Sequence, residues 1–437
     1  MNETSFFHPT RPGYRYTVLF FVSVLTFGSY FAYDSLGAIA STLAEKLGWD
    51  RETIGQTYTL YSVAAILSVF IGGLLIDKIG TRKASLLFTT LVAIGAFIVA
   101  LAHGIWLLYV GRFIFGWGSE SLVVAQSAIF ARWFKGKELA LSFGIGLTIS
   151  RLGTLFSFNT EELIAKYFGD YRYALWAAVI FCVLSLLANF VYIILDRRAE
   201  KILQLSEEGG GDKIVVADIK KFSGSYWYVT ILCLTFYSAM FPFTSLSTDF
   251  FHTKWGLPLT AGGEGGFFAQ VFDNIIHMFS TAGGTTTIPI FASMVFAPFF
   301  GKLVDKFGHR ALMMLFGALL IIPAFLAMGF TMMNPILPMI FIGTAFVLVP
   351  AAMWPSIPII VEKNRVGTAF GLTTTIQNIG LALFPWLNGL LRDMTQDYTA
   401  SMVMFSCLGV VGFVFALLLK RADAREGGRL ERVEAKA

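Results

Sequence analysis

Residues 73–83 read GLLIDKIGTRK, and residues 301–310 read GKLVDKFGHR. Both segments follow the pattern Gly-x-x-x-Asp-Lys-x-Gly-x-Arg, and their first positions lie 228 residues apart. Each segment comes directly after an apolar run. Glycine allows close helix packing and a tight turn, and aspartate can accept hydrogen bonds from a helix N-terminus and from basic side chains. Two copies in register predict a duplicated helical unit with the same turn in each half.

The composition is that of a membrane protein. Of 437 residues, 56% are hydrophobic and only 14% are charged, against roughly 25% charged residues in soluble domains. The mean hydropathy is +0.69. This excludes a soluble enzyme, a disordered chain and a single-span receptor. It also excludes a nucleic-acid binder, because the basic residues are spread over short loops instead of forming one patch.

Twelve apolar runs are long enough to cross a bilayer, which takes about 20 residues. They cover residues 16–40, 55–76, 84–103, 105–131, 139–165, 172–195, 226–250, 286–304, 311–331, 336–361, 366–391 and 399–420, with ends good to about two to four residues. We therefore expect an all-α membrane protein with an N-terminal six-helix bundle (1–195), a polar linker (196–225), a C-terminal six-helix bundle (226–420) and a tail (421–437).

The basic residues predict the orientation. Of 33 lysines and arginines, 25 fall in segments on the side of both termini, six fall on the other side and two lie within spans. We therefore expect both termini in the cytoplasm. On the outer side, residues 252–285 form an insertion in which Phe267, Phe268, Val271, Phe272, Ile275, Ile276 and Phe279 share one helical face. That pattern predicts an amphipathic helix that lies on the membrane surface or covers the mouth of a cavity.

The duplicated turn resembles the loop signature of the major facilitator superfamily, in both halves and at the same topological position. The resemblance implies two six-helix bundles around a central cavity that opens alternately to either side. We expect the signature residues to hold closed states in place instead of touching substrate. They are Gly73, Asp77, Lys78, Gly80 and Arg82 in the first copy, and Gly301, Asp305, Lys306, Gly308 and Arg310 in the second.

Four ionisable residues stand out inside predicted spans, where charge is costly and usually faces a cavity or a partner: Asp34, Arg112, Glu120 and Arg151. Counting along the helices places Glu120 about 21 Å from the outer end of its span and Arg151 about 18 Å from the inner end of the next, so the two share a depth. Asp34 and Arg112 both lie near outer ends. Either pair could be a structural ion pair. For Asp34 and Arg112, a structural role and a functional role are equally good interpretations.

For Glu120 and Arg151 we favour a binding role. A carboxylate and a guanidinium at one depth suit a zwitterion, because arginine binds a carboxylate through two hydrogen bonds and glutamate accepts from an ammonium group. Without substrate the two side chains can neutralise each other.

A closer resemblance covers nearly the whole chain. It rests on FGSYFAYD (27–34), GRFIFG (111–116) with ESL (120–122) and AQ (125–126), WFKGKEL (133–139), SRLG (150–153), LDRRAE (195–200), FPF (241–243), WP (354–355) and QN (377–378). These segments are similar to one subfamily, the lysosomal dipeptide transporters. The resemblance implies a dipeptide uniporter in which Glu120 and Arg151 bind the two ends of the peptide. Mammalian members also depend on a glycosylated luminal partner.

Further residues are expected near the cavity. They are Tyr30, Tyr33, Asp34, Tyr61, Tyr237, Phe243, Trp354, Gln377 and Asn378. We expect no cofactor and no metal site, because the three cysteines stand singly in apolar runs and the five histidines lie in loops or at span ends. The expected partners are a dipeptide and the lipid bilayer, with no nucleic acid, and a monomer is expected.

Three alternatives stay open at this stage. The first is a proton-coupled carrier of organic anions or amino acids that uses Arg151 as its only anchor. The second is a non-transporting membrane receptor, which has less need for a duplicated latch. An intramembrane enzyme is disfavoured because no nucleophile–base cluster falls in the spans. Uniport is favoured because the first span lacks the Glu-x-x-Glu-Arg signature of proton-coupled peptide symporters. The expected location is a bacterial inner membrane, with a lysosomal membrane as the alternative.

Overall fold

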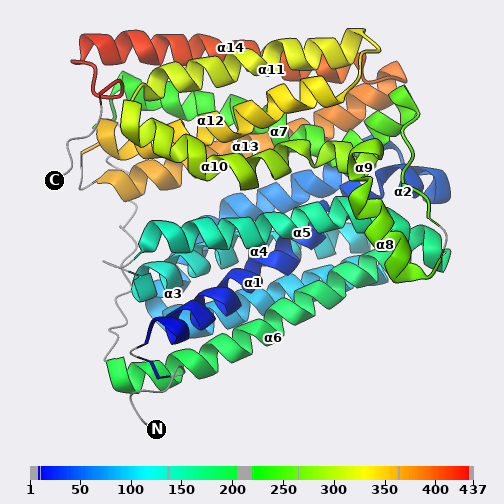
Figure 1. Ribbon diagram of the computed structural model, residues 1–437, viewed down its shortest axis with the longest axis horizontal. Helices are drawn as coiled ribbons and strands as arrows, with labels where there is room; N and C mark the ends of the chain where they lie inside the picture. The colour runs from blue at the N-terminus through cyan, green and yellow to red at the C-terminus, as the bar shows by residue number, and fades with distance from the viewer. Residues whose placement is uncertain are drawn as a thin grey trace. The chain divides into compact units, whose positions relative to one another are not determined.

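The computed structural model describes residues 8–9, 11–134, 138–203, 219, 221–263, 265–362 and 365–432, and these residues are almost entirely helical (Figure 1). The long helices are α1 (Pro12–Ala38), α3 (Arg51–Leu101), α4 (Ile105–Phe134), α5 (Leu139–Phe168), α6 (Arg172–Leu203), α7 (Gly224–Trp255), α10 (Ile288–Phe307), α11 (Arg310–Phe330), α12 (Ile336–Ile360), α13 (Val366–Thr395) and α14 (Thr399–Arg425). Four short elements are α2 (Ala40–Leu47), α8 (Phe267–Ile276), η2 (Met278–Ser280) and α9 (Ala282–Thr286).

These helices confirm the twelve expected spans, because α3 contains two of them. Its backbone breaks at Gly80, which has φ 80° and ψ 160°. In the second copy of the motif, Gly308 (φ 68°) ends α10 just before α11 begins. Both angles lie in a region that residues with a Cβ rarely adopt. The same glycine of the motif therefore makes the turn in each half.

The described helices also have the hydropathy of membrane spans. By length and composition, nine of the described helical segments are apolar enough to cross a membrane, among them α7 at 32 residues and α12 at 25 residues. Together with the twelve-span pattern, this defines an all-α, multi-pass membrane protein.

The chain divides into two compact units. Unit 1 comprises the described residues of Met1–Ser35, Leu60–Ser157 and Ile164–Gly211, and unit 2 those of Leu36–Thr59, Phe158–Leu163 and Asp212–Ala437. This division differs from the one expected from sequence, since α2 and the first turns of α3 belong to unit 2. Helix α6 continues to Leu203 and α7 begins at Gly224. Most of the expected linker 196–225 that lies between them, 204–218 and 220, falls outside the described residues.

Glycines bring the helices of unit 1 close together. A Cβ on Gly153 of α5 would lie 2.3 Å from the carbonyl oxygen of Phe27 on α1, and a Cβ on Gly116 of α4 would lie 2.5 Å from that of Tyr61 on α3. Small residues at such contacts let backbones approach closely in membrane proteins. Gly153 follows Arg151 by two residues, and Gly116 precedes Glu120 by four. These close contacts therefore position the backbone from which both charged side chains extend.

Unit 2 has an aromatic core between α7, α11 and α14. Helix α11 packs along α14 and α12, and α7 packs against α13 and α14 (Figure 1). Phe243 of α7 lies at the centre of this core, with ring contacts to Phe250, Phe325 and Phe405 at 5.3–6.1 Å. Only 2% of Phe243 is exposed. This residue therefore packs between helices, and we leave it out of the candidate binding set.

Candidate functional site

Three charged side chains of unit 1 lie within electrostatic range of one tyrosine. Arg151 of α5, Glu120 of α4 and Asp34 of α1 all act electrostatically on the hydroxyl group of Tyr30. Arg151 acts on Asp34 as well. A cation and two carboxylates from three different helices therefore act on the same tyrosine inside the unit.

Glu120 is held by a second tyrosine. The hydroxyl of Tyr61 donates to Oε1 of Glu120 at 2.6 Å and lies 2.9 Å from Oγ of Ser119. The ring of Tyr33 packs edge-on against that of Tyr61, with centroids 4.6 Å apart. Glu120 itself is partly exposed. One of its oxygens is therefore engaged by Tyr61, and the carboxylate can still accept from a ligand.

Arg112 fixes the end of α1 that carries Asp34. Its guanidinium donates to the backbone carbonyls of Ala32 and Tyr33 at 3.3 Å, and it is 1% exposed. The charge of Arg112 acts on Asp34, as does that of Arg151, and Asp34 forms a hydrogen bond with Thr154. Asp34 therefore interacts with both arginines of the expected pairs and with Thr154, which was not among the expected site residues.

In unit 2, two of the expected residues lie side by side. The indole Nε1 of Trp354 on α12 donates to the hydroxyl of Tyr237 on α7 at 3.0 Å. Gln377 of α13 accepts from the Cys233 thiol at 3.5 Å. Asn378 is buried, and its amide donates to the backbone carbonyl of Thr374 in its own helix.

The first copy of the loop motif is joined to α6. Arg82 contacts Asp196 and Glu200, each at 2.5 Å. The buried Asp196 carboxylate also receives hydrogen bonds from Arg132 at 2.9 Å and from the indole of Trp133 at 2.7 Å. In the same motif the side chains of Asp77 and Lys78 are exposed. Within unit 1, Arg82 is therefore the motif residue with the strongest structural contacts.

The second copy is joined to the end of the chain. His309 and Glu431 lie 2.8 Å apart, and the buried Arg310 donates to the carbonyl of Arg432 at 3.4 Å. The ammonium group of Lys306 lies over the ring of Phe307, 5.2 Å from its centroid. The side chain of Asp305 lies outside the described part of the structure. Residues 430–432 of the expected tail are thus in contact with the motif.

A buried carboxylate that the sequence analysis missed organises one end of unit 2. Asp249 of α7 accepts from Arg51 Nε at 3.2 Å and Nη2 at 3.0 Å, from Ser41 at 3.1 Å and from Tyr398 at 2.6 Å. Its side chain is 1% exposed. Asp249 falls within the expected span 226–250, so the rule that ionisable residues in spans have partners could have found it.

Neighbouring groups complete this network. Asp393 of α13 accepts from the backbone N–H groups of Arg51 and Glu52, at 3.2 and 2.7 Å. These N–H groups open α3 and have no partner within the helix. Burial and the charge of Asp249 raise the pKa of Tyr398 well above its usual range, so Tyr398 stays protonated and donates. The start of α3 is therefore bound to α7 and α13 inside unit 2.

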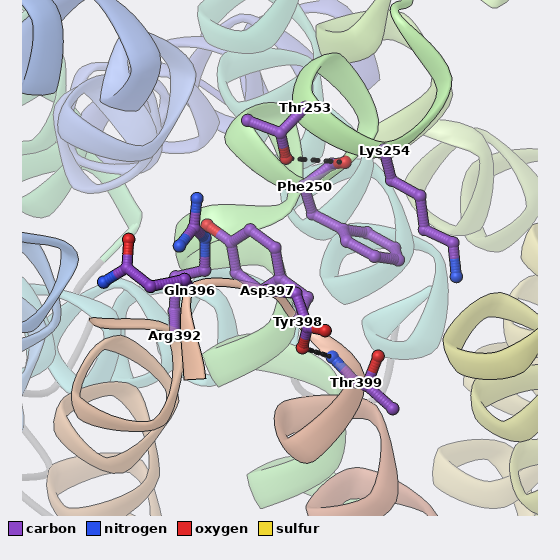
Figure 2. A pocket seen from close by; sticks show the side chains of 8 residues that line it. All are labelled: Phe250, Thr253, Lys254, Arg392, Gln396, Asp397, Tyr398 and Thr399. Atoms are coloured by element: carbon purple, nitrogen blue, oxygen red, sulfur yellow. Dashed lines mark hydrogen bonds between the residues drawn. The ribbon is translucent and has the colours of Figure 1, made fainter. Parts of the chain in front are cut away.

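Beside this network is a cavity of about 230 Å³ with two cationic residues in its wall (Figure 2). The guanidinium of Arg392 lies over the ring of Tyr398, 5.3 Å from its centroid. Lys254 points away from the ring of Tyr398 in Figure 2 and donates to the carbonyls of Met328 and Gly329. These carbonyls end α11, where a cation is favourable. Neither cation was among the expected site residues.

Comparisons with known proteins agree with the fold and the motifs. The model of the Major Facilitator Superfamily matches residues 22–272 and 267–436. The chain belongs to this family, and it is therefore a transporter of the multi-pass membrane class. This confirms the resemblance recognised in the loop motifs.

Two members of the family are similar to this chain over nearly its full length. The lysosomal dipeptide transporter MFSD1 of Danio rerio is 32% identical over 436 residues, covering 96% of this chain and 90% of the relative. The protein of the same description from Homo sapiens is 32% identical, covering 97% and 89%. Among solved structures, the nucleoside transporter NupG aligns with a TM-score of 0.71 at 15% identity, over 92% of this chain and 99% of NupG. At that identity the likeness concerns the fold alone.

Proposed function

We propose that the protein transports dipeptides by uniport and that Arg151 and Glu120 bind the two ends of the peptide. The observation that supports the proposal is that the charges of Arg151, Glu120 and Asp34 all act on Tyr30 in unit 1. The similarity to transporters described as carriers of dipeptides supports the same substrate class.

The chemistry of the cluster fits a free peptide. A carboxylate terminus pairs with the guanidinium of Arg151, which has a fork of donors for it. The ammonium terminus pairs with Glu120, whose carboxylate is already oriented by Tyr61. The charge of Arg151 acts on Asp34, and we propose that Asp34 balances this charge while the site is empty. A charged group in a span is costly without such partners, so an empty and a loaded state are both neutralised.

We further propose that the Asp249 network is the contact that closes the transporter on the α2 side. It binds the start of α3, which belongs to the N-terminal half of the sequence, to α7 and α13 of the C-terminal half, all within unit 2. Alternating access requires such a contact to form and break. The motif residues Asp77 and Asp305 are proposed to serve the opposite side, and the side chain of Asp77 is exposed.

The substrate proposal is tested by binding to the purified protein. Specific ligands raise the melting temperature by mass action. We expect free dipeptides to do so, and N-acetylated or C-amidated forms of the same dipeptide to do so much less. Equal stabilisation by blocked and free peptides would contradict two-ended binding. Stabilisation by organic acids alone would favour the carrier of organic anions.

Uniport is tested separately in liposomes loaded with a pH-sensitive dye. We expect dipeptide uptake without a change in internal pH. Proton movement driven by dipeptide, and lost in Asp34→Asn or Glu120→Gln, would show proton coupling through these carboxylates instead.

A further inference from the structure

A long apolar groove runs between α10 and α12 in unit 2. Its volume is about 290 Å³. Phe291 and Phe296 line it on α10, and Ile340 and Val347 line it on α12. Phe291, Phe296 and Ile340 are 40%, 49% and 47% exposed, so a ligand can reach the groove from outside unit 2. The one hydroxyl in the wall, on Thr344, donates to the carbonyl of Ile340 in its own helix. The groove therefore offers a ligand apolar contact only.

The length of the groove matches one leaflet of a bilayer. Its α10 wall extends from Ile288 to Phe300, twelve steps that span about 18 Å at 1.5 Å per residue. Half of a hydrocarbon core of about 30 Å is about 15 Å. The groove starts where α10 and α12 start, at Ile288 and Ile336, and thus at one surface of the membrane.

Helix α8 marks that surface. Phe268, Phe272 and Ile276 repeat every four residues and are 84%, 68% and 58% exposed. On the other side of the helix, the buried Asn274 donates to the carbonyl of Asn159 and accepts from the backbone of Ala261. A helix that turns polar contacts inward and aromatic rings outward lies in the interfacial region of a membrane.

The groove continues from this interfacial face. Phe279, just after α8, lines the groove and contacts Phe291 with ring centroids 6.0 Å apart. At its base α10 and α12 touch, where a Cβ on Gly343 would lie 3.1 Å from the Cβ of Ala292. A helix about 10–12 Å across and about 18 Å long would occupy roughly 1,700 Å³, far more than the volume of about 290 Å³ in the groove. The groove therefore suits a hydrocarbon chain better than a protein helix.

We propose that the α10–α12 groove is a binding site for one acyl chain of a membrane lipid, with α8 and Phe279 placing the lipid's head at the interface. The lipid is held there instead of exchanging freely as it does along other exposed helix faces. This proposal does not rest on the transported substrate, because the groove shares no residue with the candidate site for peptides.

The test maps lipid contacts on the full-length protein in nanodiscs of phosphatidylcholine that carries a photoreactive group on its acyl chain. After illumination, labelled peptides are located by mass spectrometry. We expect labelling of the groove walls to exceed that of the exposed α11 residues Phe316 and Leu319 by about tenfold, which corresponds to preferential burial of a few methylene groups. Equal labelling of both surfaces would overturn the proposal, and this comparison needs no variant.

A matched pair of variants sharpens the test. Thr344→Trp fills the groove, whereas Phe341→Trp adds the same side chain to an exposed position of α12 that does not line it. We expect labelling of the α10 wall to fall severalfold in Thr344→Trp and to stay unchanged in Phe341→Trp. Unchanged labelling in a folded Thr344→Trp would overturn the proposal, and so would crosslinks from the groove to a second copy of the chain.

Discussion

The carboxylate of Asp249 in unit 2 and that of Glu120 in unit 1 have opposite surroundings. Asp249 is 1% exposed and accepts four hydrogen bonds, two of them from one guanidinium. Glu120 is partly exposed, and among the described residues Tyr61 donates a hydrogen bond to it. A carboxylate with all of its lone pairs in use stabilises a contact, whereas one with spare acceptor capacity can take a ligand. The difference separates a closing contact from a binding site.

The largest effect is expected from removing the first carboxylate. Asp249→Ala leaves Arg51 without its counter-charge and Tyr398 without its acceptor, and losing one partner of a buried pair typically costs about 3–5 kcal/mol. Thermal unfolding of the purified protein should show a clearly lower midpoint. Asp273→Ala is the control, since Asp273 forms a half-exposed pair with His277, and such pairs are worth about 0–1 kcal/mol. Equal shifts of the unfolding midpoint in Asp249→Ala and Asp273→Ala would contradict the structural role of the Asp249 network.

Tyr398→Phe removes one donor from Asp249 and keeps the ring that lies under Arg392. A hydrogen bond to a charged group contributes about 1.5–3 kcal/mol, so the loss should be smaller than for Asp249→Ala. The variant also tests the raised pKa of Tyr398. Above about pH 10, tyrosine ionises in the unfolded chain but not at this position, so the parent loses stability as pH rises and Tyr398→Phe should lose less. If the free energy of unfolding fell equally with pH in the parent and in Tyr398→Phe above about pH 10, the raised pKa of Tyr398 would be contradicted.

Glu120→Gln should have the smallest effect on stability and a clear effect on binding. The amide oxygen can still accept from Tyr61 and from a peptide ammonium, but the charge is gone. We expect the free energy of unfolding to stay within about 0.5 kcal/mol of the parent, because the amide keeps the hydrogen bond from Tyr61 and removes a charge that is costly in a span. Dipeptide affinity should fall about tenfold, equivalent to about 1.4 kcal/mol. Calorimetric titration measures the affinity, and loss of stability without loss of affinity would make Glu120 a structural residue.

Much of the fold could be predicted from the sequence because it repeats simple signals. Apolar runs of the length of a bilayer located twelve spans, and two copies of one loop motif identified the family. What the sequence could not show is which residues of distant segments meet. The contact of Arg51 with Asp249 joins positions 198 residues apart, and neither residue belongs to a repeated motif.

Part of the candidate site stays a prediction. Helix depth grouped Glu120 with Arg151, and the charges of both residues act on Tyr30. Depth along a span says nothing about the direction in which a side chain points, so Tyr61 as the donor to Glu120 and Thr154 as the partner of Asp34 did not follow from it. The same limit applies to Phe243, which is aromatic and mid-span like Tyr237 but points into the packing core.

The central claim, that Arg151 binds the peptide carboxylate, is tested most directly by equilibrium binding of a free dipeptide to Arg151→Ala and to Asp77→Asn. Arg151 lies in the charged cluster of unit 1, whereas Asp77 is exposed in the loop motif. We expect Arg151→Ala to lose detectable binding, because the carboxylate then has no counter-charge. Asp77→Asn should bind like the parent and be slower in liposome uptake. Parent-like binding by Arg151→Ala, together with loss of binding in Asp77→Asn, would contradict the account.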